Sequence, residues 1–410
     1  MRRCLAVPIL TCAASMLASA DIAAVLPFTN GASGVPNNAQ ANLDWIGESI
    51  AETVRDALTM RGLLTIERAE IQEAFHRLAL RQRAPLSQAS VIKIGETLDA
   101  EHVLYGSFEF TPAKQTAGGE AGTRGSLKIT ARIIDLRHLH LSPEFIESGS
   151  IEDLATLQAH LAWRALELLA PKLAPPESEF RTLRAPIRLD AEEAYVRGLL
   201  ATDPEQKERL FTQAARLDAR SGHPCYQLGE IHYQRKEYRQ AVDWLEKVGA
   251  EDVHYREANF LLGLARFQSG DYAGAQKAFQ IIVAAVPLSE VYNDLGAAES
   301  RRNLPQAFDD FRRAMEGDPT DPVYHFNMGY LLWKKGEFAA AADRFRAVLD
   351  RDPEDQVATL LLGRCLKKQG PRSGDAKSAD ARLQALERLK SNYEERAYRE
   401  LKSMLEPKAP

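Results

Sequence analysis

An apolar residue followed by glycine recurs at a nearly constant interval through the second half of the chain. The pairs are Leu228-Gly229, Leu262-Gly263, Leu295-Gly296, Met328-Gly329 and Leu362-Gly363, and successive pairs lie 34, 33, 33 and 34 residues apart. A period of this length is typical of stacked repeats, in which each unit buries its apolar face against its neighbours. The second half is therefore predicted to be a repeat array and not one globular domain.

Each unit is predicted to be a pair of helices. The glycine lies in one amphipathic stretch, a turn such as Ser269-Gly270-Asp271 follows, and a second amphipathic stretch begins. The second stretch repeats a small residue, an aromatic residue and a helix-ending proline: Ala275, Phe279 and Pro287, then Ala307, Phe311, Ala314 and Pro319, then Ala341, Phe345 and Pro353. This pattern resembles the tetratricopeptide repeat (TPR) over about residues 191–370, with a degenerate first unit around Gly198 and Phe211. The resemblance implies an all-α solenoid that binds peptides or protein segments in its concave groove.

The repeat register predicts which side chains line that groove. Positions three before and one, four and five after each glycine should face it. The candidates are Tyr226, Tyr233, Phe260, Phe267, Asn293, Phe326, Tyr330, Trp333 and Lys334, extended by Arg364, Lys367 and Lys368. They predict a surface that is aromatic in its middle and basic at its carboxy-terminal end, suited to an extended segment with apolar anchors and an acidic group.

Two alternatives bear on this groove. The aromatic residues could instead pack between helices, which is common at the fourth position after the glycine. A clamp for a terminal carboxylate is disfavoured, because Asn293 and Asn327 lack the set of basic neighbours that such a clamp uses. Binding of a partner also requires that the groove is open to another polypeptide. Residues 371–410 are predicted to be a helical cap, with a helix from Ala381 to Leu405.

The first half is predicted to be an α/β domain over residues 21–170, a mixed sheet with flanking helices. Expected strands cover 22–28, 63–68, 102–110, 126–136 and 145–149, and expected helices cover 43–60, 70–80, 87–98 and 151–169. Pro171, Pro175 and Pro176 then indicate a stiff linker over residues 171–190.

Several short motifs of this half occur in a recognisable order. They are Val25-Leu26-Pro27-Phe28, Trp45-Ile46-Gly47-Glu48, Glu67-Arg68, Ile94-Gly95-Glu96, Leu98 and Val103-Leu104-Tyr105-Gly106-Ser107. Together they resemble the TolB amino-terminal-like domain, a type shared with the curli-secretion lipoprotein CsgG and the flagellar protein FlgO. The resemblance implies a bacterial envelope protein that acts by assembly and not by catalysis. Pore formation is not implied, because the lipidated cysteine and extra membrane-inserting strands of CsgG-type proteins are not evident.

The amino terminus resembles a secretory signal. Met1-Arg2-Arg3 precedes an apolar stretch from Cys4 to Leu17, and Ala18-Ser19-Ala20 supplies small residues for cleavage after Ala20. A lipid anchor at Cys12 is the alternative, although Thr11 stands where a small residue is expected. Residues 1–20 are therefore predicted to be a signal peptide, and the mature protein to be periplasmic or secreted.

The sequence offers little for catalysis, metals or nucleic acids. The net charge is −5 and no long basic cluster occurs, which argues against nucleic acid as a partner. His138 and His140 could share one face of a strand, but a metal site needs further matched ligands. No common nucleophile, phosphate-loop or metalloprotease motif is found, so neither catalytic residues nor cofactors are predicted.

The hypothesis that follows is an exported, non-catalytic scaffold or adaptor that binds a protein or peptide partner through the TPR groove, without an integral membrane span. An alternative is an outer-membrane-associated assembly or secretion accessory that forms homo-oligomers through the α/β domain. An enzyme would require a cleft of convergent polar groups that the sequence does not display.

Overall fold

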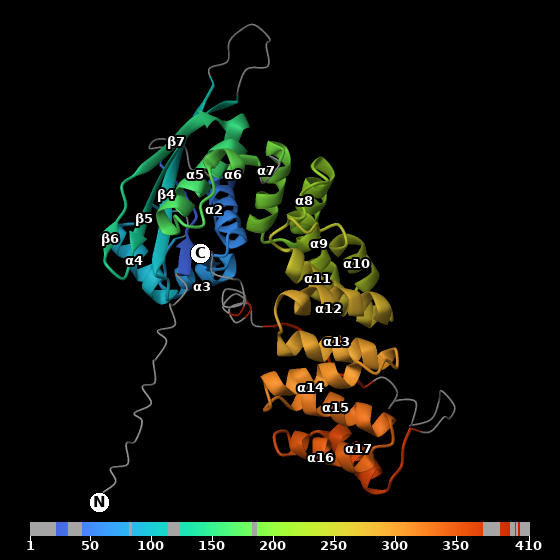
Figure 1. The fold of residues 1–410 in the computed structure, drawn as a ribbon. Coiled ribbons are helices and arrows are strands. Elements are labelled where there is room, and N and C mark those ends of the chain that lie inside the picture. The colour runs from blue at the N-terminus through green and yellow to red at the C-terminus, as the bar shows by residue number, and fades with distance from the viewer. Residues whose placement is uncertain are drawn as a thin grey trace, which may run out of the picture.

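A computed structural model describes residues 22–31, 43–81, 84–113, 124–182, 187–371 and 386–393, together with Tyr398 and Leu401. It shows a mixed sheet with flanking helices, followed by a column of helix pairs (Figure 1). This arrangement confirms the predicted fold class. The predicted signal sequence and Cys12 lie outside the described residues.

The sheet is parallel at one edge and antiparallel at the other. Its strands are β1 (Ile22–Val25), β2 (Thr29–Asn30), β3 (Leu64–Thr65), β4 (His102–Pro112), β5 (Gly125–Asp135), β6 (His140–Leu141) and β7 (Phe145–Ser150). The order is β3-β1-β4-β5-β6, with β2 beside β4 and β7 beside β5. β1 runs parallel to β3 and β4, whereas β4 and β5 form a long antiparallel hairpin.

Helices cover both faces of this sheet. Alternate strand residues point to opposite faces, so Val25 and Leu104 join one core while Ala24 and Val103 join the other. The first core is closed by α2 (Asp44–Met60) and α5 (Leu154–Leu169), and the second by α3 (Arg68–Arg77) and α4 (Gln88–Thr97). A strand buried on both faces explains the continuous apolar run at the start of this region.

The repeat region stacks helix pairs in one column. Its helices are α7 (Leu189–Leu200), α8 (Pro204–Leu217), α9 (His223–Gln234), α10 (Tyr238–Leu245), α11 (Tyr255–Ser269), α12 (Tyr272–Ala285), α13 (Ser289–Arg301), α14 (Ala307–Gly317), α15 (Pro322–Lys334), α16 (Phe338–Leu349) and α17 (Gln356–Leu366). The repeat glycines from Gly198 to Gly329 lie where the partner helix packs closest, whereas Gly363 has nothing within 4 Å of an added methyl group. A methyl group added at Gly296 would approach the Phe311 ring to 2.8 Å, and one at Gly198 would approach the Phe211 ring to 2.5 Å. The small-plus-aromatic pattern is therefore a helix-crossing contact, which includes the degenerate first unit.

Aspartates begin several of the repeat helices. The side chain of Asp321 accepts a hydrogen bond from the backbone of Val323 at the start of α15, and Asp355 does the same for Val357 and Ala358 at the start of α17. Such caps satisfy backbone N–H groups that have no partner within the helix. They also fix the two carboxylates at one end of the first helices of two successive units.

The segment predicted as a linker is packed against its surroundings. Residues 171–190 contain a short helix, α6 (Glu177–Thr182), and α7 already begins at Leu189. Phe180 is buried in the same core as α2 and α5, and that core continues into Tyr195 and Phe211 of the first helix pair. The α/β region and the repeats are thus joined by one apolar core.

The carboxy-terminal region differs from the prediction. Residues 386–393, expected within a helix from Ala381 to Leu405, form neither helix nor strand and bend at Ser391, whereas Tyr398 and Leu401 are helical. We call residues 386–393 the tail. The tail does not cap the open end of the solenoid; it lies along the first helices of the repeats, because its backbone is hydrogen-bonded to α13 and α15.

Candidate functional site: the tail-binding surface of the repeats

The first helices α11, α13, α15 and α17 share one face, and the tail lies on it. We call the side chains of these helices that contact the tail the tail-binding surface. It corresponds to the predicted groove, and the expectation that this groove is open to another polypeptide is wrong for this structure. The chain's own residues occupy it.

The centre of the tail-binding surface holds the tail by its backbone. The Asn327 amide binds Arg388 at two points, accepting from its N–H at 2.8 Å and donating to its carbonyl at 2.7 Å. Asn293 donates to the same carbonyl at 2.9 Å, and Asp294 accepts from the Lys390 N–H at 2.8 Å. Residues two apart in an extended chain present their backbone groups on the same side, which is why side chains from two helices reach both.

These polar groups are fully buried and support one another. The Asn327 side chain donates to the side-chain amide oxygen of Asn293 at 2.8 Å, and the Asn293 side chain donates to the Asp294 carboxylate at 3.0 Å. Burial raises the pKa of Asp294 well above its usual range, despite the hydrogen bonds from Lys390 and Asn293. Buried polar groups are costly when unpaired, so this row fits a backbone that supplies partners to Asn293, to Asn327 and to one oxygen of Asp294.

The predicted aromatic residues divide between the surface and the core. Phe260 and Phe326 contact the tail: the Phe260 ring centroid lies 4.9 Å from that of Tyr393, and the Arg388 guanidinium lies 3.5 Å above the Phe326 ring. Tyr330 and Trp333 are buried beneath, where Tyr330 stacks between Phe326 and Trp333. Phe260 and Phe326 therefore face the tail, whereas Tyr330 and Trp333 pack beneath them as in the packing alternative, and a partner at these residues stays a prediction.

Three other predicted aromatics lie outside the centre. Tyr226 stacks on His254 with ring centroids 4.6 Å apart, at the junction with the α/β domain. Tyr233 packs against Tyr238, and burial raises its pKa to about 12. Phe267 is buried with Arg301 beside its ring. These residues extend the aromatic row toward the amino-terminal end of the repeats.

The predicted basic residues are not equivalent. The Lys334 amine lies 2.8 Å from the Glu387 carboxylate of the tail and donates to Ser300 at 2.7 Å. Arg364 is half-buried on α17, and Lys367 and Lys368 are exposed just beyond its end. Lys334 therefore contacts the tail directly.

Several residues that contact the tail were not among the predicted groove residues, although two of them occupy positions that the repeat register assigns to the groove. Ser300 and Arg301 occupy the fourth and fifth positions after Gly296, both predicted to face the groove. The acidic contributors Asp321 and Asp355 each lie eight residues before a repeat glycine, at the helix-capping position. Asn327 was considered only as part of a carboxylate clamp, whereas the structure uses it to bind backbone.

A second polar cluster lies where the repeats meet the α/β domain. A cavity of 420 Å³ there is lined by residues of both parts, among them Arg55, Arg68 and His254. Beside it, His223 of α9 is buried, with Nε2 2.8 Å from the Asp56 carboxylate of α2 and Nδ1 3.2 Å from that of Asp252. Burial alone would lower the pKa of His223, but the two carboxylates outweigh it and raise it to about 10.

The neighbouring groups respond to this charged histidine. Burial opposes ionisation of Asp252, yet the His223 charge holds its pKa at about 2. Burial and the same positive charge lower the pKa of His254 to about 4, so its ring is neutral at physiological pH. The cluster is an ion triad that joins α2 to the repeats, and its groups are already paired with one another.

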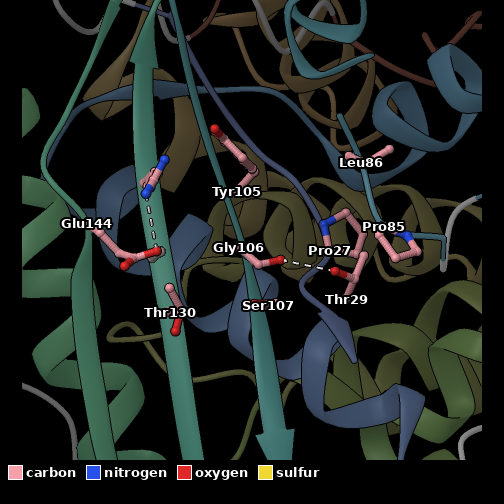
Figure 2. A pocket seen from close by; sticks show the side chains of 11 residues that line it. Pro27, Thr29, Pro85, Leu86, Tyr105, Gly106, Ser107, Thr130 and Glu144 are labelled. Atoms are coloured by element: carbon pink, nitrogen blue, oxygen red, sulfur yellow. Dashed lines mark hydrogen bonds and ion pairs between the residues drawn. The ribbon is translucent and has the colours of Figure 1, made fainter. Parts of the chain in front are cut away.

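The α/β domain carries a smaller hollow along its hairpin (Figure 2). The hollow measures 280 Å³ and is lined by β4, β5 and nearby loop residues, including Pro27, Leu86 and Tyr105. Its drawn polar contacts are Thr29 donating to the Gly106 carbonyl at 3.5 Å and an ion pair of Arg132 with Glu144 at 3.5 Å. These are contacts between neighbouring strands and loops, and they do not converge on a point in the hollow.

The described ranges contain neither a metal-binding cluster nor a membrane-spanning helix. Within them, no three His, Cys, Asp or Glu side chains gather as a metal site would require, and His138 pairs with Asp135 at 2.7 Å. None of the helices there combines the length and apolar character needed to span a bilayer.

Comparison with known proteins identifies the repeats. The tetratricopeptide repeat family profile matches residues 255–322 and 326–397. Among solved structures, YrrB, described as a TPR protein with an unusual peptide-binding site, is 19% identical with a TM-score of 0.39, over 42% of this chain and 91% of that one. MamA of Desulfovibrio magneticus RS-1 is 24% identical with a TM-score of 0.36, over 40% and 95%. PilF of Pseudomonas aeruginosa is 19% identical with a TM-score of 0.36, over 43% and 83%. No curated protein matches the chain.

Proposed function

We propose that this chain is an exported, non-catalytic adaptor whose tail-binding surface takes up an extended segment of a partner protein. Tetratricopeptide repeats generally mediate contacts between proteins and are typically non-catalytic scaffolds. The observation that carries the proposal is the buried row of Asn293, Asp294 and Asn327, whose hydrogen bonds are directed at the backbone of an extended chain. Besides the Asn327–Asn293 hydrogen bond that links α15 to α13, the row directs its hydrogen bonds at the tail backbone, which fits a peptide ligand.

Export and the type of the α/β domain form part of the same proposal. They are supported by the signal-like first 20 residues and by the TolB-like order of motifs on β1, α2 and β4. Mass spectrometry of the protein recovered from producing cells tests the first point. We expect a mature amino terminus at Asp21, and a lipid-bearing terminus at Cys12 would contradict it.

The adaptor role is tested by site-specific photocrosslinking in producing cells. A photoreactive amino acid replaces Gln268, an exposed residue of α11 on the predicted groove side, and in a matched control it replaces Ile281, which is 40% exposed on the second helix α12. We expect a discrete adduct with a segment of one partner at position 268 and not at position 281. The adduct should disappear when Asn293 and Asn327 are both replaced by alanine. Equal adducts at both positions, or none at position 268, would argue against an adaptor.

A further inference from the structure

The tail is bound through its side chains as well as its backbone, and these side-chain contacts describe a ligand. Glu387 is the most enclosed: its carboxylate is 1% exposed and lies 2.8 Å from Lys334, 2.6 Å from Arg301 and 2.8 Å from the Ser300 hydroxyl. A neutral side chain here would leave two neighbouring cations without their counter-charge. This subsite therefore selects a carboxylate.

The next subsite selects a planar cation. The Arg388 guanidinium binds the Asp355 carboxylate through two nitrogens, at 2.6 and 3.0 Å, and lies 3.5 Å above the Phe326 ring. A two-point ion pair combined with an aromatic face suits arginine better than lysine, whose charge is a single point. The helix cap Asp355 thus has a second role as an acidic anchor.

A second cation and an aromatic ring complete the pattern. The Lys390 amine pairs with Asp321, the cap of α15, and lies 5.2 Å from the Tyr324 ring centroid. Tyr393 packs edge-on against Phe260 at 89°, and its hydroxyl accepts a hydrogen bond from Arg256 at 3.0 Å. Between these polar contacts, the tail residues Leu386 and Leu389 pack on the apolar core of the repeats.

We propose that the tail is a built-in competitor for the partner's site, and that the partner segment shares its chemistry. That segment is an extended chain with a carboxylate, an arginine directly after it, a second cation two residues later and a tyrosine three residues after that. This inference rests on the proposed adaptor function and adds the sequence class of the ligand. Because the tail is covalently attached, it competes at an effective concentration of millimolar order, so a partner must match its contacts closely to displace it.

The experiment uses the full chain and a fluorescent peptide with the tail sequence Leu-Glu-Arg-Leu-Lys-Ser-Asn-Tyr. Fluorescence anisotropy measures its affinity for the wild type, for a released-tail variant (Glu387→Gln with Arg388→Ala) and for a control (Ser391→Ala with Asn392→Ala). Ser391 and Asn392 are exposed residues of the same tail. Circular dichroism and thermal melting check that all three proteins are folded.

We expect the released-tail variant to bind the peptide about tenfold more tightly than the wild type or more, because the millimolar intramolecular competitor is removed. The control should match the wild type. A peptide with Gln in place of its Glu should bind the released-tail variant at least about tenfold more weakly, since it leaves the two cations unpaired. This comparison needs no further change in the protein.

Each contrary result would refute a different part of the proposal. Equal affinity for wild type and released-tail variant would show that the tail is not a competitor, and equal binding of a scrambled peptide would refute the side-chain pattern. If the released-tail variant binds no tail peptide while the crosslink at position 268 still forms, this inference fails and the adaptor function stands. If the peptide binds as expected but no adduct forms in cells, the adaptor function fails alone.

Discussion

The buried His223 should control how firmly the repeats are attached to the α/β domain. Both of its ring nitrogens face a carboxylate oxygen, at 2.8 Å from Asp56 and 3.2 Å from Asp252, so both must carry a proton and the ring must be an imidazolium. His223→Gln removes this charge, leaving the buried Asp252 carboxylate without its counter-ion and Asp56 paired with Arg55, at 3.7 Å. Breaking a buried ion pair in this way costs about 3–5 kcal/mol of unfolding free energy.

The pH dependence gives an independent measure of the same interaction. The folded-state pKa of His223 is about 10 and its ordinary value is 6.5, so its stabilisation is complete below pH 6.5 and is lost as the pH rises toward 10. This difference between the folded-state and ordinary pKa of His223 corresponds to at most about 5 kcal/mol of unfolding free energy, at 1.36 kcal/mol for each pKa unit. The advantage of wild type over His223→Gln should therefore shrink steadily from pH 6.5 to pH 10.

Urea unfolding followed by tryptophan fluorescence at several pH values measures both effects. The matched control is His232→Gln on the same helix, because His232 faces a single carboxylate, that of Glu237, at 2.6 Å, and that carboxylate is 40% exposed. Such a pair contributes about 1 kcal/mol or less. A cost for His223→Gln no larger than for His232→Gln, or a difference from wild type that is constant between pH 6.5 and 10, would refute the ion triad.

Two further predictions concern the repeats, and thermal melting checks both. Gly296→Ala should destabilise the chain by about 1–3 kcal/mol, because the added methyl group meets the Phe311 ring. Gly363→Ala should stabilise α17 by about 0.5–1 kcal/mol, because nothing lies within 4 Å of the added methyl group. A stability change of the same sign at both positions would contradict this reasoning. Burial and the neighbouring Asp310 raise the pKa of Glu299 from 4.5 to about 8, so wild-type stability should fall as the pH rises across that interval. Glu299→Gln should remove this fall and be more stable than wild type above pH 8, and parallel melting curves would disprove it.

The repeats could be predicted because their signal is local and recurs. Gly263 lies against Phe279 and Gly296 lies against Phe311, so the same glycine–aromatic contact recurs in successive repeats. The strands were predictable for a similar reason, since apolar residues on β4 and β5 alternate between the two cores with period two. Both patterns depend only on residues that are close in sequence or equivalent by repeat.

The tail could not be predicted in this way. Leucine and tyrosine residues recur from Leu383 to Leu405 at a spacing that fits one face of a helix, and the expected helix follows from this spacing. In the structure, the backbone of Arg388 is held by Asn327 and Asn293, which are 61 and 95 residues away. Tertiary hydrogen bonds to these distant side chains outweigh the local helical pattern, and no short-range signal reports them.

The candidate site shows the same division. Phe260, Phe326, Asn293 and Lys334 follow from the repeat register, and each contacts the tail. The junction through His223 does not follow from any register, because its partner Asp56 lies 167 residues away in another fold. Contacts that recur in several repeats can therefore be predicted from the sequence, whereas long-range contacts that occur once cannot.

The course of the tail also bears on the mechanics of the solenoid. Units of such an array contact only their neighbours, so the column can bend and lengthen like a spring through small rotations at each step. The tail is tied to α11 through Tyr393, to α13 and α15 through its backbone, and to α17 through Arg388. Because the tail contacts the first helices of four successive repeat units, it fixes the rotation from each unit to the next. Loss of the tail should therefore let the repeat column stretch and twist. A partner segment that displaces the tail would then also change the curvature of the column.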